Sequence, residues 1–380
     1  MRIVIIGGGI GGLATAIALR QRGIASEVYE AATEIAAVGA GIMMSPNAME
    51  VLSRLGLTDD VRAQGFALHS GEMRDARDGL LQRIDLSAAG GRVDISTVAI
   101  HRARLQQILV SKIDPSSLHI GRRCTAVTAA TDSAIVHFDD GAEVRADVVI
   151  GADGLRSVAR GLVAPDVKLR YAGQTAYRGV AHIRLVPEMV RSGGEIWGAG
   201  RRFGYGAIAY DEVYWFATRD ALEGERTDAG RMREALGASF AGYPYPASTL
   251  IAATDESRII RTDLYDFAPM KPWHRGRVVL IGDAAHATTP NLGQGGAQAI
   301  EDAWVLADQL SRSDDPSKAS EAYEAIRRPK ATFVVNRSRQ IGRMVHLSNP
   351  VARATRNFIL RHTPPSAARR QLERLFTLNF

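Results

Sequence analysis

Three short apolar segments, far apart in the chain, each end in a glycine-containing turn. They are Arg2–Ile6 before Gly7, Asp147–Ile150 before Gly151, and Val278–Ile281 before Gly282. Their lengths and β-branched residues are typical of buried strands rather than helices. Because these strand ends are spread over nearly the entire chain, they predict one α/β domain that is assembled from separated segments.

The first turn carries the pattern GxGxxG at Gly7, Gly9 and Gly12. With 37 glycines in the chain, this pattern alone is weak evidence. Its context is stronger, because a helical pattern follows and a second strand, Ser26–Tyr29, then ends at Glu30, close to the spacing of about 20 residues found in dinucleotide sites. The glycines let the backbone approach a pyrophosphate, and Glu30 can accept hydrogen bonds from ribose hydroxyls. The acidic residue favours FAD or NAD over NADP.

The third turn opens with Gly282 and Asp283 and continues into a glycine-rich loop. That loop holds Pro290, Gly293, Gln294 and Gly295, and a helical apolar pattern then runs to Leu310. This arrangement places free backbone N–H groups, the positive end of a helix dipole and one carboxylate side by side. It suits a polyhydroxylated cofactor that becomes anionic during its chemistry. The alternative is an ordinary strand–turn–helix unit whose glycines serve packing alone.

Two other regions carry weaker signals. Arg102 begins a predicted helix to about Val110, and a cation at that end is not stabilised by the helix dipole. An anionic ligand explains it, and so does a solvated arginine. The second glycine turn contributes Asp153, followed by a predicted short helix that bears Ser157 and Arg160. An Asp-Gly turn is common, so its weight comes from being one of three.

Three polar residues near the third turn invite a catalytic reading that we do not favour. His286 lies close to Asp283 in sequence, and we expect it to serve packing or hydrogen bonding. Glu301 and Asp302 resemble a pair of catalytic carboxylates. Consecutive helix residues point about 100° apart, so we expect these two to lie on a solvated face or near a helix terminus.

Composition narrows the functional classes. The chain has 380 residues and a formal net charge of +6, but its arginines are dispersed and form no block with interleaved aromatic residues. We therefore expect small anionic molecules rather than nucleic acid as ligands. The single cysteine, Cys124, excludes a disulfide framework and a cysteine-rich metal site, and we expect no metal centre. Without a signal peptide or a membrane-length apolar run, the chain is expected to be cytoplasmic, as a monomer or a dimer.

The middle of the chain differs from its ends in its predicted secondary structure. Strand-like stretches rich in aromatic residues follow one another from Tyr177 to Thr218, with no helical pattern until Met232–Phe240. They predict an antiparallel sheet in an inserted domain. Residues 67–85 are predicted to add a hairpin with its turn at Asp78–Gly79, and residues 36–44 to form a loop. Two basic amphipathic pieces near the C-terminus are expected to form a packed cap rather than to lie on a membrane.

The three motifs together resemble those of the single-component FAD-dependent aromatic hydroxylases, the para-hydroxybenzoate hydroxylase superfamily of group A flavoprotein monooxygenases. GGGIGG from Gly7, GADGLRSVAR from Gly151 and GDAAHATTPNLGQGGAQAIEDA from Gly282 occur in the family order. The likeness covers residues 1–340. Within the family, the branch of salicylate and urate hydroxylases and tetracycline monooxygenases is most similar.

The resemblance implies an α/β fold with three parts. A Rossmann-like FAD-binding domain would comprise residues 1–66, 97–165 and 270–340, an antiparallel-sheet substrate domain residues 67–96 and 166–269, and C-terminal helices residues 341–380. The implied enzyme uses NADH or NADPH and dioxygen to hydroxylate an aromatic or heteroaromatic small molecule through a flavin hydroperoxide. The alternatives are a flavin-dependent reductase or dehydrogenase, a monooxygenase for a larger polycyclic antibiotic-like substrate, and a non-enzymatic FAD-bound sensor.

The resemblance also assigns residues to FAD. The ADP half would be bound by Gly7, Gly9, Gly12 and Glu30, and the flavin would contact Arg102. Asp153 belongs to a motif that serves both FAD and the nicotinamide cofactor, and Asp283 would bind the ribityl chain. The isoalloxazine ring would be lined by Pro290, Gly293, Gln294 and Gly295. Arg202 and Tyr214 fall where urate hydroxylases place substrate-site residues, so they are our candidate catalytic residues. Urate itself does not follow, because many relatives have arginine and tyrosine there.

Aromatic and cationic residues of the predicted inserted sheet suggest the character of the substrate wall. They are Tyr177, Trp197, Arg202, Phe203, Tyr205, Tyr214 and Phe216. Such a wall suits a planar ligand, including an anionic one. Strand alternation is expected to turn about half of these side chains away from the ligand.

Overall fold

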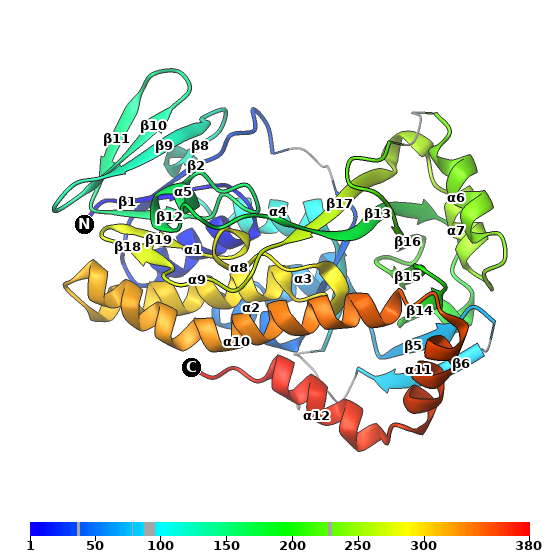
Figure 1. Ribbon diagram of the computed structural model, residues 1–380. Coiled ribbons are helices and arrows are strands. Elements are labelled where there is room, and N and C mark those ends of the chain that lie inside the picture. Colours follow the sequence, from blue (N-terminus) through cyan, green and yellow to red (C-terminus); the bar gives the residue numbers. More distant parts are fainter. Residues whose placement is uncertain (36–38, 78, 87–95, 227–229) are drawn as a thin grey trace.

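A largely parallel sheet forms the centre of one half of the molecule (Figure 1). The computed structural model describes the chain except for residues 36–38, 78, 87–95 and 227–229. In spatial order the described strands of this sheet are β18 (His274–Arg275), β19 (Val278–Leu280), β12 (Val148–Gly151), β1 (Ile3–Ile6), β2 (Ser26–Tyr29) and β8 (Leu118–His119). The three predicted glycine-turn strands, β1, β12 and β19, are direct neighbours and run parallel. The predicted assembly of one sheet from distant segments is confirmed.

Helices and a small sheet enclose these strands, as a parallel sheet of fully buried Val and Ile residues requires. Helix α1 (Ile10–Gln21) packs against α9 (Gly295–Arg312), and α9 packs against α10 (Pro316–Val345). The shorter helices of this half are α2 (Pro46–Arg54), α3 (Thr58–Gln64), α4 (Arg102–Val110), α5 (Ala159–Val163) and α8 (Asp283–His286). An antiparallel sheet of β9 (Cys124–Ala129), β10 (Ala134–Phe138) and β11 (Glu143–Ala146) adds its apolar face to the same core.

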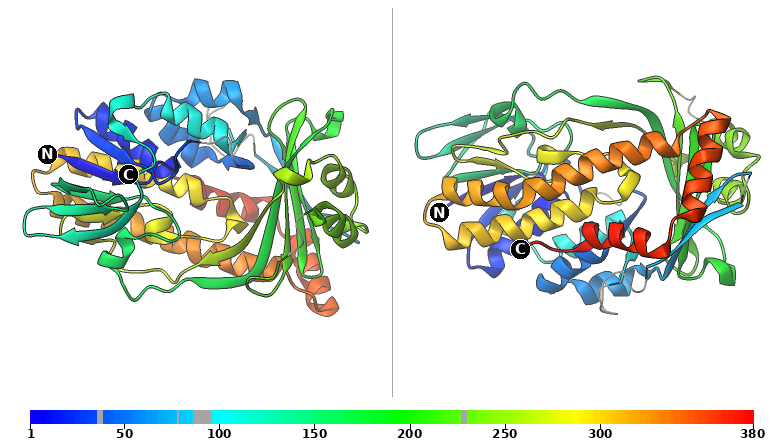
Figure 2. Two further views of the ribbon diagram at one scale, coloured as in Figure 1. Left: turned by 90° about the horizontal axis from the view of Figure 1, so that it is seen from above. Right: turned by 60° about the horizontal axis from the view of Figure 1, so that its bottom comes forward.

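A second large sheet, mostly antiparallel, occupies the other half of the molecule (Figures 1 and 2). In spatial order its described strands are β17 (Ile260–Asp266), β13 (Arg170–His182), β16 (Glu212–Asp220), β15 (Arg201–Ala207), β14 (Ser192–Gly198), β5 (Ser70–Asp75) and β6 (Gly79–Asp85). The predicted hairpin is confirmed as β5 and β6, although Asp78 of its turn lies outside the described residues. Helices α6 (Met232–Phe240) and α7 (Ala247–Ala252) cover one face through Phe203 and Trp215.

One short sheet corrects a prediction. Residues 41–44, expected to be part of a loop, form strand β3 (Gly41–Met44), while residues 36–38 of that loop lie outside the described residues. Strand β3 pairs with β7 (Val98–His101), which also pairs with β4 (Phe66–Ala67). The glycines of this stretch suggested a loop, but Gly41 lies in the strand because the Tyr214 side chain packs directly against its backbone.

The long helix α10 runs beside both large sheets (Figure 1). Near its start the Tyr323 hydroxyl donates to the carbonyl of Leu280 in β19 at 3.1 Å. Near its end the carbonyl of Gly342 accepts from Gln174 of β13 at 3.3 Å, and Arg339 pairs with Asp266 of β17 at 2.8 Å. One element therefore contacts both halves of the fold.

The last two helices pack on the body of the protein, as expected. Helix α11 (Pro350–His362) lies against β6, and α12 (Pro365–Phe376) lies against α2. No helix in the described part of the chain combines the length and the apolar character that a bilayer-crossing segment requires.

Candidate functional site

The first glycine turn is shaped by close backbone contacts. A Cβ at Gly12 would lie 2.0 Å from the carbonyl oxygen of Gly7, and Gly7 has a φ of +108° beside Ala152. Gly9 is different, because no described atom lies within 4 Å of the position of its absent Cβ. Glycine at 12 is required by the protein itself. The open space at Gly9 is where a pyrophosphate could approach.

Glu30 ends β2 beside this turn. Its carboxylate accepts hydrogen bonds from the backbone N–H of Gly8 at 2.7 Å and of Ala32 at 2.8 Å. Both bonds hold the carboxylate next to the glycines. Each carboxylate oxygen can accept more than one hydrogen bond, so capacity for ribose hydroxyls remains.

Asp283 stands at the third turn, directly after Gly282, whose φ is +56°. Its side chain is exposed to solvent, yet protein surrounds it closely enough that desolvation raises the pKa of its carboxyl group. His286, Arg102 and Arg160 act on this pKa in the opposite direction. Arg102 is exposed at the start of α4, and its charge lowers the pKa of the Asp283 carboxyl group, so the two lie within electrostatic reach of each other.

Asp153 mainly serves the backbone of its own turn. Its carboxylate accepts from the Ser157 hydroxyl at 2.6 Å and from the N–H groups of Val158 and Ala159 at 2.7 and 3.1 Å. These are the donors that the start of α5 would otherwise leave unsatisfied. The prediction that Ser157 belongs to a short helix is wrong, because α5 begins at Ala159 and Ser157 precedes it.

Arg160 joins the second turn to the third and was not among the predicted site residues. Its buried guanidinium donates to the carbonyl of Leu155 at 2.6 Å and to that of Ala284, next to Asp283, at 3.2 Å. Burial lowers the pKa of Arg160, and the charges of Asp153 and Asp283 oppose that effect. Arg160, the last residue of the motif GADGLRSVAR, was visible in the sequence. Nothing in the sequence indicated which carbonyl groups its guanidinium would contact.

The glycine-rich loop after α8 presents backbone toward the same region. Pro290 is exposed, Gly293 has a φ of +63°, and α9 starts at Gly295. The Gln294 side chain instead points into the core, where it donates to the Ser45 hydroxyl at 2.9 Å and accepts from Asn47 at 3.0 Å. Only the backbone of Gln294 can therefore face a ligand at this turn.

A buried cluster of charges lies beneath that loop and overturns one prediction. Glu301 and Asp302 are fully buried rather than solvated. Arg327 of α10 donates to Asp302 at 2.8 Å and pairs with Glu301, and Lys330 donates to Glu301 at 2.7 Å. The expectation failed because the partners of these carboxylates belong to the next helix, α10. The geometry of α9 alone does not predict which residues of α10 pack against it.

The same cluster reaches the third glycine turn. Asp302 accepts from the Gly282 N–H at 2.9 Å and shares a 2.5 Å hydrogen bond with His286. Burial alone would raise the pKa of Asp302, but His286 and Arg327 hold it at about 2. His286 thus has the hydrogen-bonding role that we expected, and the cluster fixes the backbone that carries Asp283.

The candidate catalytic residues lie on the face of the second sheet that α6 and α7 leave uncovered. Arg202, Tyr214, Phe216 and Trp197 share this face by strand register, whereas Tyr177, Phe203 and Tyr205 belong to the opposite, helix-covered face. The predicted division of the aromatic residues is therefore confirmed. Arg202 reaches the glycine-rich loop, because its guanidinium donates to the side-chain oxygen of Asn291 at 2.9 Å.

Strand β3 lies between this sheet face and the loop. Gly41 allows close contact with the Tyr214 ring, since a Cβ there would lie 2.4 Å from it. On the other side, Met43 approaches Gly293 and Ile42 approaches Gly296. Met43 is 42% exposed although it sits between these elements. Apolar side chains therefore line the region between the candidate residues and the loop.

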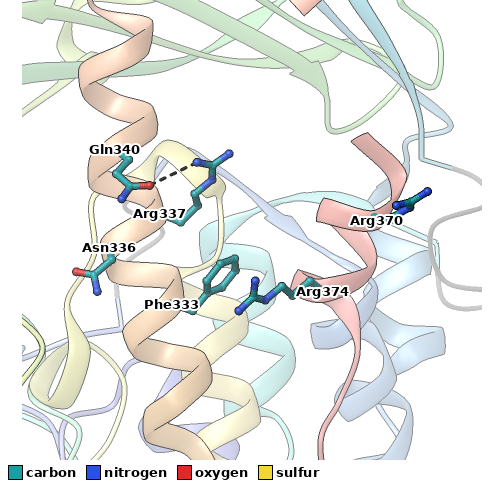
Figure 3. Close-up of a pocket in the computed structure, with 6 residues that line it drawn as sticks. All are labelled: Phe333, Asn336, Arg337, Gln340, Arg370 and Arg374. Atoms are coloured by element: carbon teal, nitrogen blue, oxygen red, sulfur yellow. Dashed lines mark hydrogen bonds between the residues drawn. The ribbon is translucent and has the colours of Figure 1, made fainter. Parts of the chain in front are cut away.

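A separate hollow of about 560 Å³ lies between α10 and α12 (Figure 3). Its lining residues are Phe333, Asn336, Arg337, Gln340, Arg370 and Arg374. The Arg374 guanidinium lies 4.2 Å from the centre of the Phe333 ring. None of the predicted site residues lines this hollow, so it is not the predicted site. Among the described residues, no group of His, Cys, Asp and Glu side chains is arranged to hold a metal ion.

These observations fit FAD as the cofactor. The open position at Gly9 and the carboxylate of Glu30 suit the pyrophosphate and ribose of an ADP unit. The Asp283 carboxylate, which solvent reaches although protein surrounds it closely, suits a polyhydroxyl chain. The start of α9 at Gly295 offers free N–H groups to a ring that gains negative charge.

Comparisons with known proteins agree. A family model described as an FAD binding domain matches residues 1–338. The chain is 39% identical to the aurachin C monooxygenase/isomerase of Stigmatella aurantiaca, covering 95% of this chain and 94% of that protein, and 35% identical to the 2-heptyl-3-hydroxy-4(1H)-quinolone synthase of Pseudomonas aeruginosa, covering 99% and 98%. Its fold matches HpxO of Klebsiella pneumoniae, solved with FAD and uric acid, with a TM-score of 0.92 and 30% identity, covering 99% and 96%. The chain therefore belongs to the FAD-dependent monooxygenases that hydroxylate aromatic and heteroaromatic compounds.

Proposed function

We propose that this FAD-dependent monooxygenase hydroxylates a bicyclic nitrogen heteroaromatic compound of the quinolone kind, with NADH or NADPH as reductant and dioxygen as oxidant. The observation that carries the proposal is that Tyr214, the Arg202–Asn291 contact and the apolar residues of β3 lie together beside the glycine-rich loop. Planar rings pack well against aromatic and aliphatic side chains, and a few polar groups fix their orientation. One relative is named for a 4(1H)-quinolone, which supports the choice of ring.

Bound FAD would supply the redox chemistry, the transfer of electrons from the nicotinamide to dioxygen. We assign its ADP half to Gly7, Gly9, Gly12 and Glu30, its ribityl chain to Asp283, and a flavin contact to Arg102. The ring would lie along the backbone of Pro290, Gly293, Gln294 and Gly295. We place Asp153 in a supporting role, because its carboxylate already caps α5.

The substrate would lie between the loop and the uncovered face of the second sheet. Tyr214 is half-buried there, and desolvation raises the pKa of its phenol, while Arg178 and Arg202 oppose that effect. A phenol that stays protonated can donate a hydrogen bond to a ring carbonyl. Arg202 and Tyr214 would therefore orient the ring, and the surrounding apolar residues would exclude water from it.

The broader assignments follow from the same reading. We propose that residues 1–66, 97–165 and 270–340 form the FAD-binding domain and residues 67–96 and 166–269 the substrate domain, although residues 87–95 lie outside the described part of the chain. We also propose a cytoplasmic enzyme that binds no nucleic acid and acts as a monomer or dimer.

The test is substrate-stimulated oxidation of NADH and NADPH by the FAD-loaded protein. A panel of quinolones, aromatic acids, purines and polycyclic antibiotics would be screened, and isotope-labelled dioxygen would be traced into the product by mass spectrometry. We expect a quinolone to accelerate nicotinamide oxidation and to acquire one labelled oxygen atom. Acceleration without label in the product would identify a reductase or dehydrogenase instead.

A further inference from the structure

Arg202 is not a free cation in the structure. Its guanidinium forms a two-point ion pair with Glu195 of the neighbouring strand β14, with 2.9 Å between Arg202 Nε and Glu195 Oε2. Trp197 donates to the same Glu195 oxygen at 2.9 Å. The Arg202 side chain is 5% exposed. Glu195 is 26% exposed, so the pair is partly buried, and its two-point geometry holds the Glu195 carboxylate against the buried guanidinium.

The pair still leaves hydrogen-bond donors available. An arginine side chain has five N–H groups. Among the described residues, Glu195 and Asn291 engage three of these five groups on Arg202. The guanidinium also lies under the Phe216 ring, 5.0 Å from its centre. The remaining two N–H groups can donate to a ligand, but the charge behind them is already balanced.

Other groups on the same face add little charge near this point. Tyr214 packs with Leu68 and Val180 in an apolar cluster. Arg178, which is partly exposed on the same face, acts on the Tyr214 phenol and also donates to Thr262 at 2.7 Å. Charges at exposed positions are screened by solvent, whereas buried ones are not. The buried part of the face therefore offers donors without net positive charge.

We propose that Glu195 is a specificity-determining residue, which neutralises Arg202 so that the site accepts an uncharged heteroaromatic carbonyl in preference to an aromatic anion. This inference rests on the proposed function, because it places the substrate against Arg202. It narrows the sequence-based expectation, which allowed an anionic ligand for the same wall. An aromatic carboxylate at this position would bring a net negative charge beside a buried arginine that is already paired with a carboxylate.

The experiment compares two ring compounds that differ by one charge. Binding of 4(1H)-quinolone and of its 2-carboxylate, kynurenate, to the FAD-loaded protein would be measured without nicotinamide, from the change in the flavin absorbance spectrum. We expect the parent protein to bind the neutral ring at least tenfold more tightly. In Glu195→Gln, Arg202 loses its counter-charge, and we expect the affinity ratio to move at least tenfold toward kynurenate.

The control is Glu72→Gln on the adjacent strand β5. Glu72 matches Glu195 in exposure, 24% against 26%, and pairs with Arg83, but strand register puts it on the opposite face of the sheet. This variant should keep the parent ratio. The double variant Glu195→Gln/Arg202→Gln, which restores charge balance, should return the ratio toward that of the parent.

The FAD content of each variant, read from its absorbance, shows whether the fold survives. Three results would overturn the inference: a parent protein that prefers kynurenate, an unchanged ratio in FAD-loaded Glu195→Gln, or no spectral response to 4(1H)-quinolone. Because the titration needs no turnover, a charge preference of the expected kind would stand even if no tested compound became hydroxylated. That outcome would refute the proposed function alone.

Discussion

The substitution Arg327→Met removes the cation that lies between two fully buried carboxylates. In the parent, Glu301 and Asp302 carry two negative charges, and Arg327 and Lys330 carry two positive ones. Without Arg327, Glu301 and Asp302 lose the cation that pairs with both of them, and Gln298 loses the donor that reaches its side-chain oxygen at 2.7 Å. Removing one partner of a buried pair costs about 3–5 kcal/mol of the free energy of unfolding.

This free energy converts into a melting temperature. An unfolding entropy of about 2.1 cal/mol/K per residue gives about 0.8 kcal/mol/K for a chain of 380 residues that unfolds as a unit. The expected decrease in Tm is therefore about 4–6 °C. Thermal unfolding followed by far-ultraviolet circular dichroism measures it, with and without added FAD.

Arg312→Met is the matched control at the end of α9. Arg312 is 71% exposed and pairs with Asp308 at 3.1 Å, and exposed pairs of this kind contribute about 0–1 kcal/mol. The double variant Arg327→Met/Asp302→Asn leaves the Glu301 carboxylate paired with Lys330, so it should lose less than the sum of its single variants. If Arg327→Met melted within about 1 °C of the Arg312→Met control, charge compensation would not be what stabilises the cluster.

Two further predictions concern the cofactor site, and a third concerns the buried charge cluster beneath it. Gly9→Ala should leave the Tm of the FAD-free protein unchanged, because no described atom meets the new Cβ, but it should weaken FAD binding in a fluorescence titration. The control is Gly161→Ala, where the position of the new Cβ is equally open. Equal FAD affinity in the two variants would contradict the assigned pyrophosphate position. Asp283→Ala should lower the FAD content of the purified protein, and a variant with full flavin absorbance would remove Asp283 from the site. The pKa of Asp302 is lowered from 3.8 to about 2, so its carboxylate stabilises the fold above about pH 4 and loses this contribution as the pH falls toward 2. Asp302→Asn should therefore flatten the dependence of Tm on pH in that interval.

The sequence predicted the parts of the site that depend on local rules. Gly7 and Gly282 follow buried strands and have positive φ angles, and Gly12 lies in the first turn of α1, where a Cβ would meet the Gly7 carbonyl oxygen. The buried strands were recognisable from their continuous Val and Ile residues. That these strands lie side by side follows from the way in which parallel strands are connected. Strand alternation also divided the aromatic residues correctly between the two faces of the second sheet.

The errors arose where a residue's role depends on a distant partner. Glu301 and Asp302 look like solvent-facing helix residues until α10 brings Arg327 against them. The pairing of Arg202 with Glu195 was likewise not predicted, because it depends on which strands lie side by side. Strand β3 was mistaken for a loop because its first residue must be glycine to admit the ring of Tyr214. Local propensity contains none of this information, since each contact spans separate elements.

Helix α10, about 45 Å long at 1.5 Å per residue, limits how this molecule can move. It is fastened to β19 through Tyr323, to β13 through Gly342 and to β17 through Arg339. The two sheets therefore cannot swing apart as hinged halves without breaking buried bonds at several points along one rigid rod. Passage of reductant, substrate and product must instead rely on displacements smaller than a domain, by loops or by the cofactor itself.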